Sequence, residues 1–411
     1  MRFTNKLCAQ HLGWMFKKHW QIQGKRVARD TGAASELAKL GIEVKNPKDV
    51  LKEPRSKQNF ERLVFAEPLI TQTAEDAFHP NWHAKPCHVY GDSNVLLEGV
   101  AQAQILTKTI EINGFPKNIE ETISKMQLNS NVDKNIQNSI MASHVLDAEQ
   151  VKLPKIKIPE RPAFTLPREY GISHNRRRRL LINKLIFECE KLSGSSVTSR
   201  RQIFDNAAFN VSLTKDGDLL QFELSADTFM TSAKPIEAVK GKYETELPDL
   251  YPIKHTITIP KKNIYTTKNS YPLRSALPCS HPHTIFVHFD KENVKNLHQT
   301  PVTTSQFQAR NLLKAFTVAS ARAKQLYGES VEQLPKPIVV QSIQTDGQTF
   351  HFGVYQLNTL QLSGLDGIKN YWFHLPNVDL FAECGYKVGR PVLEGYNKDC
   401  FRYLKAFYSN C

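Results

Sequence analysis

Residues 337–359 read PIVVQSIQTDGQTFHFGVYQLNT, with two runs rich in β-branched and aromatic residues on either side of Asp346-Gly347. This pattern predicts a β-hairpin, because both residues of an Asp-Gly pair accept the positive φ that a type I′ turn requires. If Thr345 lies opposite Gln348, the two strands pair in a single register with Ile343 opposite Phe350.

That register sorts the hairpin's side chains onto two faces. One face is mostly apolar and holds Val339, Gln341, Ile343, Phe350, Phe352 and Val354. The other face is polar but uncharged and holds Ser342, Gln344, Thr349 and His351. A solvated strand face usually carries Lys or Glu, so we expect this second face to be covered. Another element of the same chain is the first expectation, and a protein or an RNA is the alternative.

The composition is that of a globular protein. Of 411 residues, 40% are hydrophobic and 23% charged, enough to bury a sizeable core. No stretch approaches the ~18 consecutive apolar residues of a membrane-spanning helix, so we expect no membrane span. The seven cysteines are scattered and form no C-x-x-C pair, which argues for reduced thiols and against a disulfide framework or a zinc ribbon.

The positive charge is concentrated at the N-terminus. The formal net charge is +14, and residues 1–29 hold seven Lys and Arg with no Asp or Glu, leaving +7 for the rest. Basic and apolar residues alternate there without a compact apolar core, so residues 1–30 are predicted to be a mitochondrial transit peptide. A disordered basic tail is the alternative.

The remainder divides at a proline-rich segment. Residues 151–168 contain four prolines and three lysines and are predicted to be an extended connector. It separates an N-terminal extension and helical region (31–150) from a main α/β domain (169–411). Within 31–150, Asp92-Ser93-Asn94 are predicted to cap a helix that runs to Thr109.

The clearest helix spans about 305–327, where apolar residues recur at helical spacing between Thr303 and Gly328. With the hairpins at 209–224 and 337–359 and helices at 173–192 and 398–408, we predict an α+β fold. Its sheet is expected to be mixed and mostly antiparallel, with hairpins packed against helices and extended N-terminal segments.

Basic residues are the candidate functional groups. Helix 305–327 carries four cations and no acid, so its cations are predicted either to contact rRNA phosphates or to line a solvated face. Four consecutive arginines in helix 173–192 are predicted to bind phosphate through their planar forks or to cap and solvate the helix. The candidate phosphate contacts are Arg176, Arg177, Arg178, Arg179, Arg310, Lys314, Arg322 and Lys324.

Catalytic and metal-binding patterns are weak. The sequence contains no G-x-S-x-G, P-loop, dinucleotide fingerprint or HExxH motif, and no catalytic residue or cofactor site is predicted. Two groups have zinc-type donors but lack paired short-spaced arms, so hydrogen-bonding histidines near turns are the preferred interpretation. The groups are His79, His83, Cys87 and His88, and Cys279, His281 and His283.

The 339–359 hairpin, together with three other segments in the same order, resembles a known family. The segments are Leu96-Leu97-Glu98-Gly99-Val100 with Leu106-Thr107-Lys108-Thr109, then Pro282-His283-Thr284, then Ala323-Lys324-Gln325-Leu326-Tyr327-Gly328. They resemble the family of large-subunit protein thirty-seven of the mitochondrial ribosome over most of residues 90–360. The related programmed-cell-death-nine type is the closest alternative.

The resemblance implies a non-catalytic structural component of the mitochondrial large ribosomal subunit, located in the matrix and acting in translation. It implies contacts with mitochondrial large-subunit rRNA and neighbouring ribosomal proteins, including a paralogous heterodimer partner. It implies no cofactor and no metal. A mitochondrial enzyme and a free mitochondrial RNA-binding protein are the other classes considered.

Overall fold

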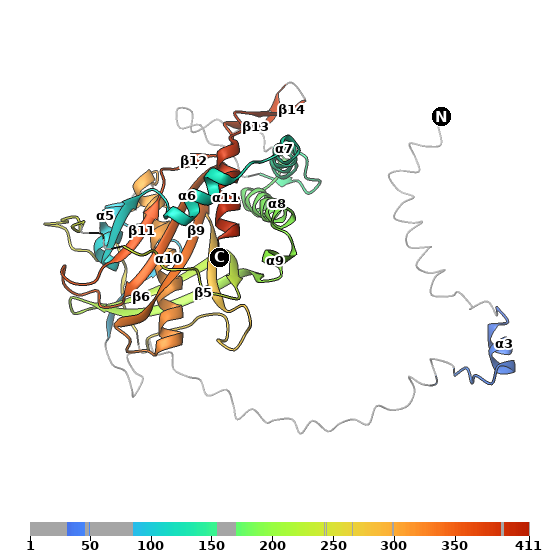
Figure 1. The fold of residues 1–411 in the computed structure, drawn as a ribbon, viewed down its shortest axis with the longest axis horizontal. Coiled ribbons are helices and arrows are strands. Elements are labelled where there is room, and N and C mark those ends of the chain that lie inside the picture. Colours follow the sequence, from blue (N-terminus) through green and yellow to red (C-terminus); the bar gives the residue numbers. More distant parts are fainter. Residues whose placement is uncertain are drawn as a thin grey trace. The chain divides into compact units, whose positions relative to one another are not determined.

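The computed structural model describes residues 31–45, 49, 85–153, 170–241, 243, 245–264, 266–297, 300–387 and 390–410. The predicted transit peptide and nearly all of the predicted connector lie outside these residues. The chain divides into two units, Met1–Thr71 and Gln72–Cys411. In the first, the described part contains one exposed helix, α3 (Ala33–Lys39). In the second, the helices and strands assemble around one large sheet (Figure 1).

The hairpin that opens the sequence is present as β9 (Gln333–Thr345) and β10 (Thr349–Thr359). Its predicted register is wrong by two residues, because Phe352 pairs with Ile343 and Val354 with Gln341. Since side chains alternate with a period of two, this shift leaves both faces of the hairpin unchanged.

The turn between the strands is also wider than the predicted type I′ turn. Of the Asp-Gly pair, only Gly347 has a positive φ, +104°. The Asp346 carboxylate instead accepts hydrogen bonds from the backbone N–H groups of Gln348 (3.1 Å) and Thr349 (2.9 Å). This side-chain turn satisfies the loop donors and moves the pairing outward by two residues. The other predicted hairpin, at 209–224, is present as β5 (Arg201–Lys215) and β6 (Asp218–Ser232), with a two-residue Asp216-Gly217 turn in which both φ angles are positive.

The main sheet has ten strands and is mixed. Its order is β2-β11-β10-β9-β8-β6-β1-β7, with β12 beside β10 and β5 beside β6. Pairing is antiparallel except between β1 and β6, β2 and β11, and β8 and β9. The strands not yet bounded are β1 (Pro86–Gly91), β2 (Thr109–Asn113), β7 (Lys261–Asn263), β8 (His281–His288), β11 (Asn370–His374) and β12 (Val378–Asp379). The predicted α+β class is confirmed.

Helices cover both faces of this sheet. One face packs against α5 (Gly99–Thr107) and α10 (Thr304–Tyr327). The other packs against α6 (Lys117–Lys125), α7 (Ser130–His144), α8 (His174–Ser193) and α11 (Lys398–Ser409), of which α7, α8 and α11 lie together in Figure 1. The smaller elements are α9 (Ser195–Thr198), the β3 (Val151–Lys152) and β4 (Tyr170–Gly171) pair, and the β13 (Glu383–Lys387) and β14 (Arg390–Glu394) hairpin.

Two strands from the predicted N-terminal region belong to the same sheet as the predicted main domain. β1 pairs with β6, and β2 pairs with β11. The segment at 151–168 therefore does not divide the sheet. The cap predicted at Asp92-Ser93-Asn94 is wrong, since α5 starts at Gly99 with Glu98 as its N-cap.

Helix α10 runs across the sheet and is buried over most of its circumference. Thr303 and Gln306 form a capping box at its start, each side chain bonding the other's backbone N–H. Tyr327 is the last helical residue, and Gly328 follows with φ +98°. The helix boundaries thus agree with the predicted ones, but its burial is more complete than a one-sided apolar stripe implies.

The uncharged face of the hairpin lies beneath α10. Asn311 donates to Nδ1 of His351 (3.0 Å) and accepts from the hydroxyl of Ser342, and Gln344 donates to the carbonyl of Phe307 (2.6 Å). The expectation that this face is covered within the same chain is confirmed. A buried face of polar residues is stable here because most of its groups find partners on the helix; the side-chain oxygen of Gln344 is the exception.

The polar row continues across the sheet as a chain of hydrogen bonds. His351 Nε2 lies 3.1 Å from Nδ1 of His374, whose Nε2 lies 2.6 Å from the carboxylate of Glu111. With Asn311 donating to His351, one consistent tautomer assignment has each imidazole donate from Nε2 toward Glu111. The chain links α10, β10, β11 and β2.

Gly353 is the tightest point of the hairpin. A Cβ added there would lie within the ring of Trp372, a fully buried side chain on β11. We expect Gly353→Ala to lower the free energy of unfolding by roughly 1–3 kcal/mol, measured by urea denaturation, because the ring has no free volume to move into. Gly385→Ala is the control, since an added Cβ meets nothing within 4 Å there. Equal losses for the two variants would contradict this packing.

Candidate functional site

The eight basic residues predicted from the sequence lie in three places. Three of them, Arg178, Arg310 and Lys314, come together from two helices at a polar cleft. Arg322 and Lys324 are buried further along α10. The remaining residues, Arg176, Arg177 and Arg179, lie on the first turns of α8.

The polar cleft has a volume of about 300 Å³, and Asp92 is its central acid. Lys314 Nζ lies 2.6 Å from the Asp92 carboxylate and donates to the carbonyl of Ser225 at 2.6 Å. The Arg310 guanidinium donates to the Asp92 carbonyl. The side chains of Arg310 and Lys314 are only 7% and 3% exposed, so the predicted solvated face is wrong.

Arg178 closes the cleft from α8. Its guanidinium donates to the carbonyl of Phe289 and lies 3.3 Å from Asp290. The imidazole of His288 faces Asp227 across the same cleft, with 3.5 Å between Nδ1 and the carboxylate. Each cation of the cleft thus has an acid or a carbonyl of this chain beside it.

Electrostatics in the cleft reflect close packing of charges. Burial, and then the neighbouring Arg310, lower the pKa of Lys314 to about 8, although Asp92 opposes this shift. Burial raises the pKa of Asp92, but the charge of Lys314 and its hydrogen bond outweigh burial and leave the pKa below its usual value. Asp92 is therefore ionised at neutral pH and holds two buried cations.

The other two cations of α10 also have internal acceptors. Arg322 donates to the hydroxyl of Ser280 at 3.0 Å and lies over the ring of Tyr271. Lys324 donates to the carbonyl of Ser212 at 2.6 Å. Phosphate contact by any α10 cation stays a prediction, and these side chains have little surface with which to make it.

The arginines at the start of α8 differ in their surroundings. Arg176 binds Asp147 and Glu149, the latter at 2.6 Å, and the exposed Arg179 lies 2.9 Å from Asp205. Arg177 is half-buried and lines a second cavity. The four side chains point in different directions, as predicted for consecutive residues of a helix.

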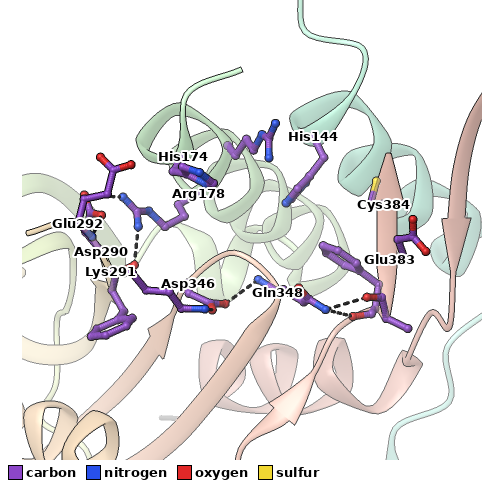
Figure 2. Close-up of a pocket in the computed structure, with 14 residues that line it drawn as sticks. His144, His174, Arg178, Asp290, Lys291, Glu292, Asp346, Gln348, Glu383 and Cys384 are labelled. Carbon is purple, nitrogen blue, oxygen red and sulfur yellow. Dashed lines mark hydrogen bonds and ion pairs between the residues drawn. The ribbon is translucent and has the colours of Figure 1, made fainter. Parts of the chain in front are cut away.

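This second cavity, of about 430 Å³, adjoins the polar cleft at Arg178. Figure 2 shows His144, His174 and Arg178 above, Asp346 and Gln348 from the hairpin turn below, and Glu383 and Cys384 at the right. Burial lowers the pKa of Arg177 and lowers that of His144 to about 4. The cavity therefore holds a neutral imidazole beside a permanently charged guanidinium.

Four of the candidate zinc donors, Cys87, His88, Cys279 and His283, have backbone carbonyls as partners. His283 Nε2 lies 2.7 Å from the carbonyl of Asn410, and Cys279 Sγ lies 3.7 Å from the carbonyl of Arg200. His79 and His83 lie outside the described residues. In the part of the chain that the structure describes, no three His, Cys, Asp or Glu are grouped as metal ligands. Nor is any helix there long and apolar enough to cross a membrane.

The sequence did not identify the acids of the cleft. Asp92, Asp227 and Asp290 come from three separate segments, and Asp92 was interpreted as a helix cap. The sequence did contain one indication of them: a helix with four cations and no acid needs hydrogen-bond acceptors from other segments. The residues that supply these acceptors are set by the packing of β1, β6 and β8 against α10.

Taken together, the large mixed sheet and the two polar cavities describe an α+β protein with a buried basic helix whose cations have acceptors within the chain. Comparisons with known proteins place it in a class. Residues 273–408 match the family of mitochondrial 28S ribosomal protein S30 (PDCD9). The matched residues include β8, α10, the β9–β10 hairpin and α11.

Comparison with individual relatives identifies the family within this class. Large ribosomal subunit protein mL37 of Gallus gallus is 30% identical over 328 residues, covering 76% of this chain and 71% of the relative. The Mus musculus protein of the same name is 29% identical, covering 76% and 69%, and that of Rattus norvegicus is 28% identical, covering 74% and 68%. The chain belongs to the mL37 family of large ribosomal subunit proteins.

Removing the central acid of the cleft tests its structural role. We expect Asp92→Asn to lower the free energy of unfolding by about 2 kcal/mol, less than for a fully buried pair because the carboxylate is 40% exposed. The loss should be smaller in Asp92→Asn with Lys314→Met, which removes the orphaned charge. Urea denaturation measures both. Asp366→Asn, at an exposed position, is the control.

Buried neutral histidines predict acid sensitivity. Burial lowers the pKa of His283 to about 3 and that of His144 to about 4, from 6.5. As the pH falls, these histidines become protonated in the unfolded chain before they do in the folded one. The free energy of unfolding is therefore at its full value above pH 6.5 and decreases as the pH drops toward 4. Each group contributes about 1.4 kcal/mol per pH unit in that window. Urea unfolding at several pH values measures the slope.

The same experiment with His283→Gln provides the comparison. Glutamine keeps an N–H donor for the Asn410 carbonyl but does not titrate. Its stability curve should be flatter between pH 6.5 and 4 than that of the natural chain. Parallel curves would show that His283 does not contribute to the slope.

Proposed function

We propose that this chain is a structural component of the large subunit of the mitochondrial ribosome and carries no catalysis of its own. The observation that carries this proposal is its membership of the mL37 family over three quarters of its length. The name of the matched S30 family supports a mitochondrial location. The segment 1–30, which has no acid before Asp30, fits a transit peptide and stays a prediction.

A role as an enzyme would need a reactive group in a pocket, and two cavities contain groups with altered pKa values. Their chemistry has a simpler account. Lys314 is held by Asp92 and a carbonyl, and Arg178 by Asp290 and a carbonyl. These ion pairs stabilise the packing of α8 and α10 against the sheet.

We further propose that the chain contacts rRNA through exposed cations. Arg176 and Arg179 are the members of the predicted set best placed for this, because their side chains are 35% and 61% exposed and they pair with the exposed acids Glu149 and Asp205, although Arg176 also binds the more covered Asp147. Such pairs contribute little and can exchange an aspartate for a phosphate. If residues 1–29 are removed as a transit peptide, their +7 charge is not available for this contact, so cations elsewhere in the chain must make it.

A related chain is the proposed protein partner. The proposal is motivated by the similarity of residues 273–408 to a second family of mitochondrial ribosomal proteins. The pairing is a proposal that co-purification from large subunits can test.

Sedimentation tests the main proposal. The full chain, tagged in mitochondria, is expected to sediment with the large subunit at moderate salt. It should also crosslink to rRNA under ultraviolet light, and a double Arg176→Gln, Arg179→Gln variant should crosslink less. Lys184→Gln, further along α8 and without an ion pair among the described residues, is the control for loss of a charge on this helix.

Other outcomes separate the alternatives. A free RNA-binding protein would crosslink to RNA yet stay away from the large-subunit peak. A chain that does neither would overturn the ribosomal proposal. Unchanged crosslinking in the double variant would remove Arg176 and Arg179 from the contact while leaving the proposal itself intact.

A further inference from the structure

Arg177 is the exception among the four consecutive arginines of α8. Arg176, Arg178 and Arg179 each lie within 4 Å of a carboxylate. Among the described residues Arg177 has no ion pair and no hydrogen-bond acceptor, and its Nε is covered without a partner. A half-buried guanidinium without an acceptor costs free energy in the isolated chain.

The cavity that Arg177 lines has room for a side chain from another molecule. Its volume is about 430 Å³, and its walls come from α7, α8, the 289–292 loop, the hairpin turn and β13. Figure 2 shows these walls around an open centre. The guanidinium therefore borders a space that a partner's acceptor can enter.

The other charges of the cavity are mostly satisfied. Lys291 lies 3.2 Å from Asp346, Arg178 lies 3.3 Å from Asp290, and Glu383 lies 2.9 Å from Lys387. Glu292 is exposed and has no ion pair among the described residues. Two charges of opposite sign, Arg177 and Glu292, thus remain unneutralised at one cavity.

We infer that this cavity is a docking socket for an acidic side chain of a neighbouring ribosomal protein, which binds Arg177 while an adjacent basic residue of the same partner meets Glu292. The inference rests on the proposed function, because it assumes incorporation into the large subunit. A planar guanidinium binds a carboxylate through two parallel hydrogen bonds, which fixes orientation as well as affinity.

The charges favour a protein over rRNA at this cavity. Its lining holds four carboxylates, Asp290, Glu292, Asp346 and Glu383, against three permanent cations. A nucleic-acid strand carries a charge about every 3.4 Å, so phosphates flanking a bound one would approach these acids. A single carboxylate next to a basic residue matches the pattern without that repulsion.

The first test compares stability with binding. Purified full chain is titrated onto large subunits from cells depleted of it, and the unfolding of the free chain is measured in parallel. Arg177→Gln should leave the midpoint temperature of the free chain unchanged or higher. It should raise the dissociation constant from the subunit about tenfold to a hundredfold, as expected for a lost charge-assisted pair.

Lys184→Gln is the matched control, since Lys184 lies on the same helix, does not line the cavity and has no ion pair among the described residues. It should change neither quantity. Binding of Arg177→Gln equal to that of the natural chain overturns the inference. A large fall in its midpoint temperature also overturns it, because Arg177 would then be a structural residue of this chain.

The second test identifies the occupant without altering Arg177. A photocrosslinking residue, p-benzoylphenylalanine, replaces Glu383 on the cavity rim, and assembled large subunits are irradiated. We expect a protease-sensitive adduct that maps to a partner peptide with an Asp or Glu next to a Lys or Arg. A nuclease-sensitive adduct assigns the cavity to rRNA and overturns the inference, as does the absence of any intermolecular adduct.

Failure of this inference is distinguishable from failure of the proposed function. If the natural chain sediments with the large subunit and Arg177→Gln binds as tightly, only the socket is wrong. If the natural chain does not associate with the large subunit at all, the ribosomal proposal itself fails.

Discussion

The ion pair between Lys314 and Asp92 is the constraint on which the arrangement of the fold depends. Helix α10 is buried against the sheet while carrying four cations, and a buried cation without a counter-charge is strongly unfavourable. Asp92, 2.6 Å from Lys314, sits just beyond β1. The helix can lie in the core only if β1 joins the sheet beside β6, which brings this loop to the helix.

The same principle explains the polar row under α10. Asn311 contacts Ser342 and His351, and His351 continues through His374 to Glu111. These groups are buried yet hydrogen-bonded, so they specify one position of the helix on the hairpin instead of weakening the core. Apolar packing alone would permit the helix to slide, whereas a mismatched polar row would leave buried donors unpaired.

Because the cations of α10 have acceptors within the chain, the more exposed cations lie elsewhere. Arg179 pairs with Asp205 at the surface, Arg176 pairs with Asp147 and Glu149, and Arg177 has no acceptor for its guanidinium among the described residues. This division suits a protein whose core must be stable before assembly and whose surface must exchange partners during it. The cations that stabilise the fold and those proposed for binding are separate sets.

Local patterns in the sequence determined the elements. The hairpins, the capping box at Thr303 and the stop at Gly328 follow from turn chemistry and periodicity, and the family resemblance rests on those same segments. The pairing of the hairpin differs from the predicted register by two residues because the Asp346 side chain accepts hydrogen bonds from two backbone N–H groups of the loop. The general preference of Asp-Gly for type I′ turns does not predict these side-chain bonds.

The tertiary structure alone decided which predicted site residues meet. Arg178 is separated from Arg310 and Lys314 by more than a hundred residues of chain, and their acids come from three further segments, so no spacing in the sequence relates Arg178 to the α10 pair or any of the three to its acids. Burial decided their role too. A basic helix looks the same in sequence whether it faces water, phosphate or an internal carboxylate, because the sign of its neighbours is set by long-range contacts and not by local periodicity.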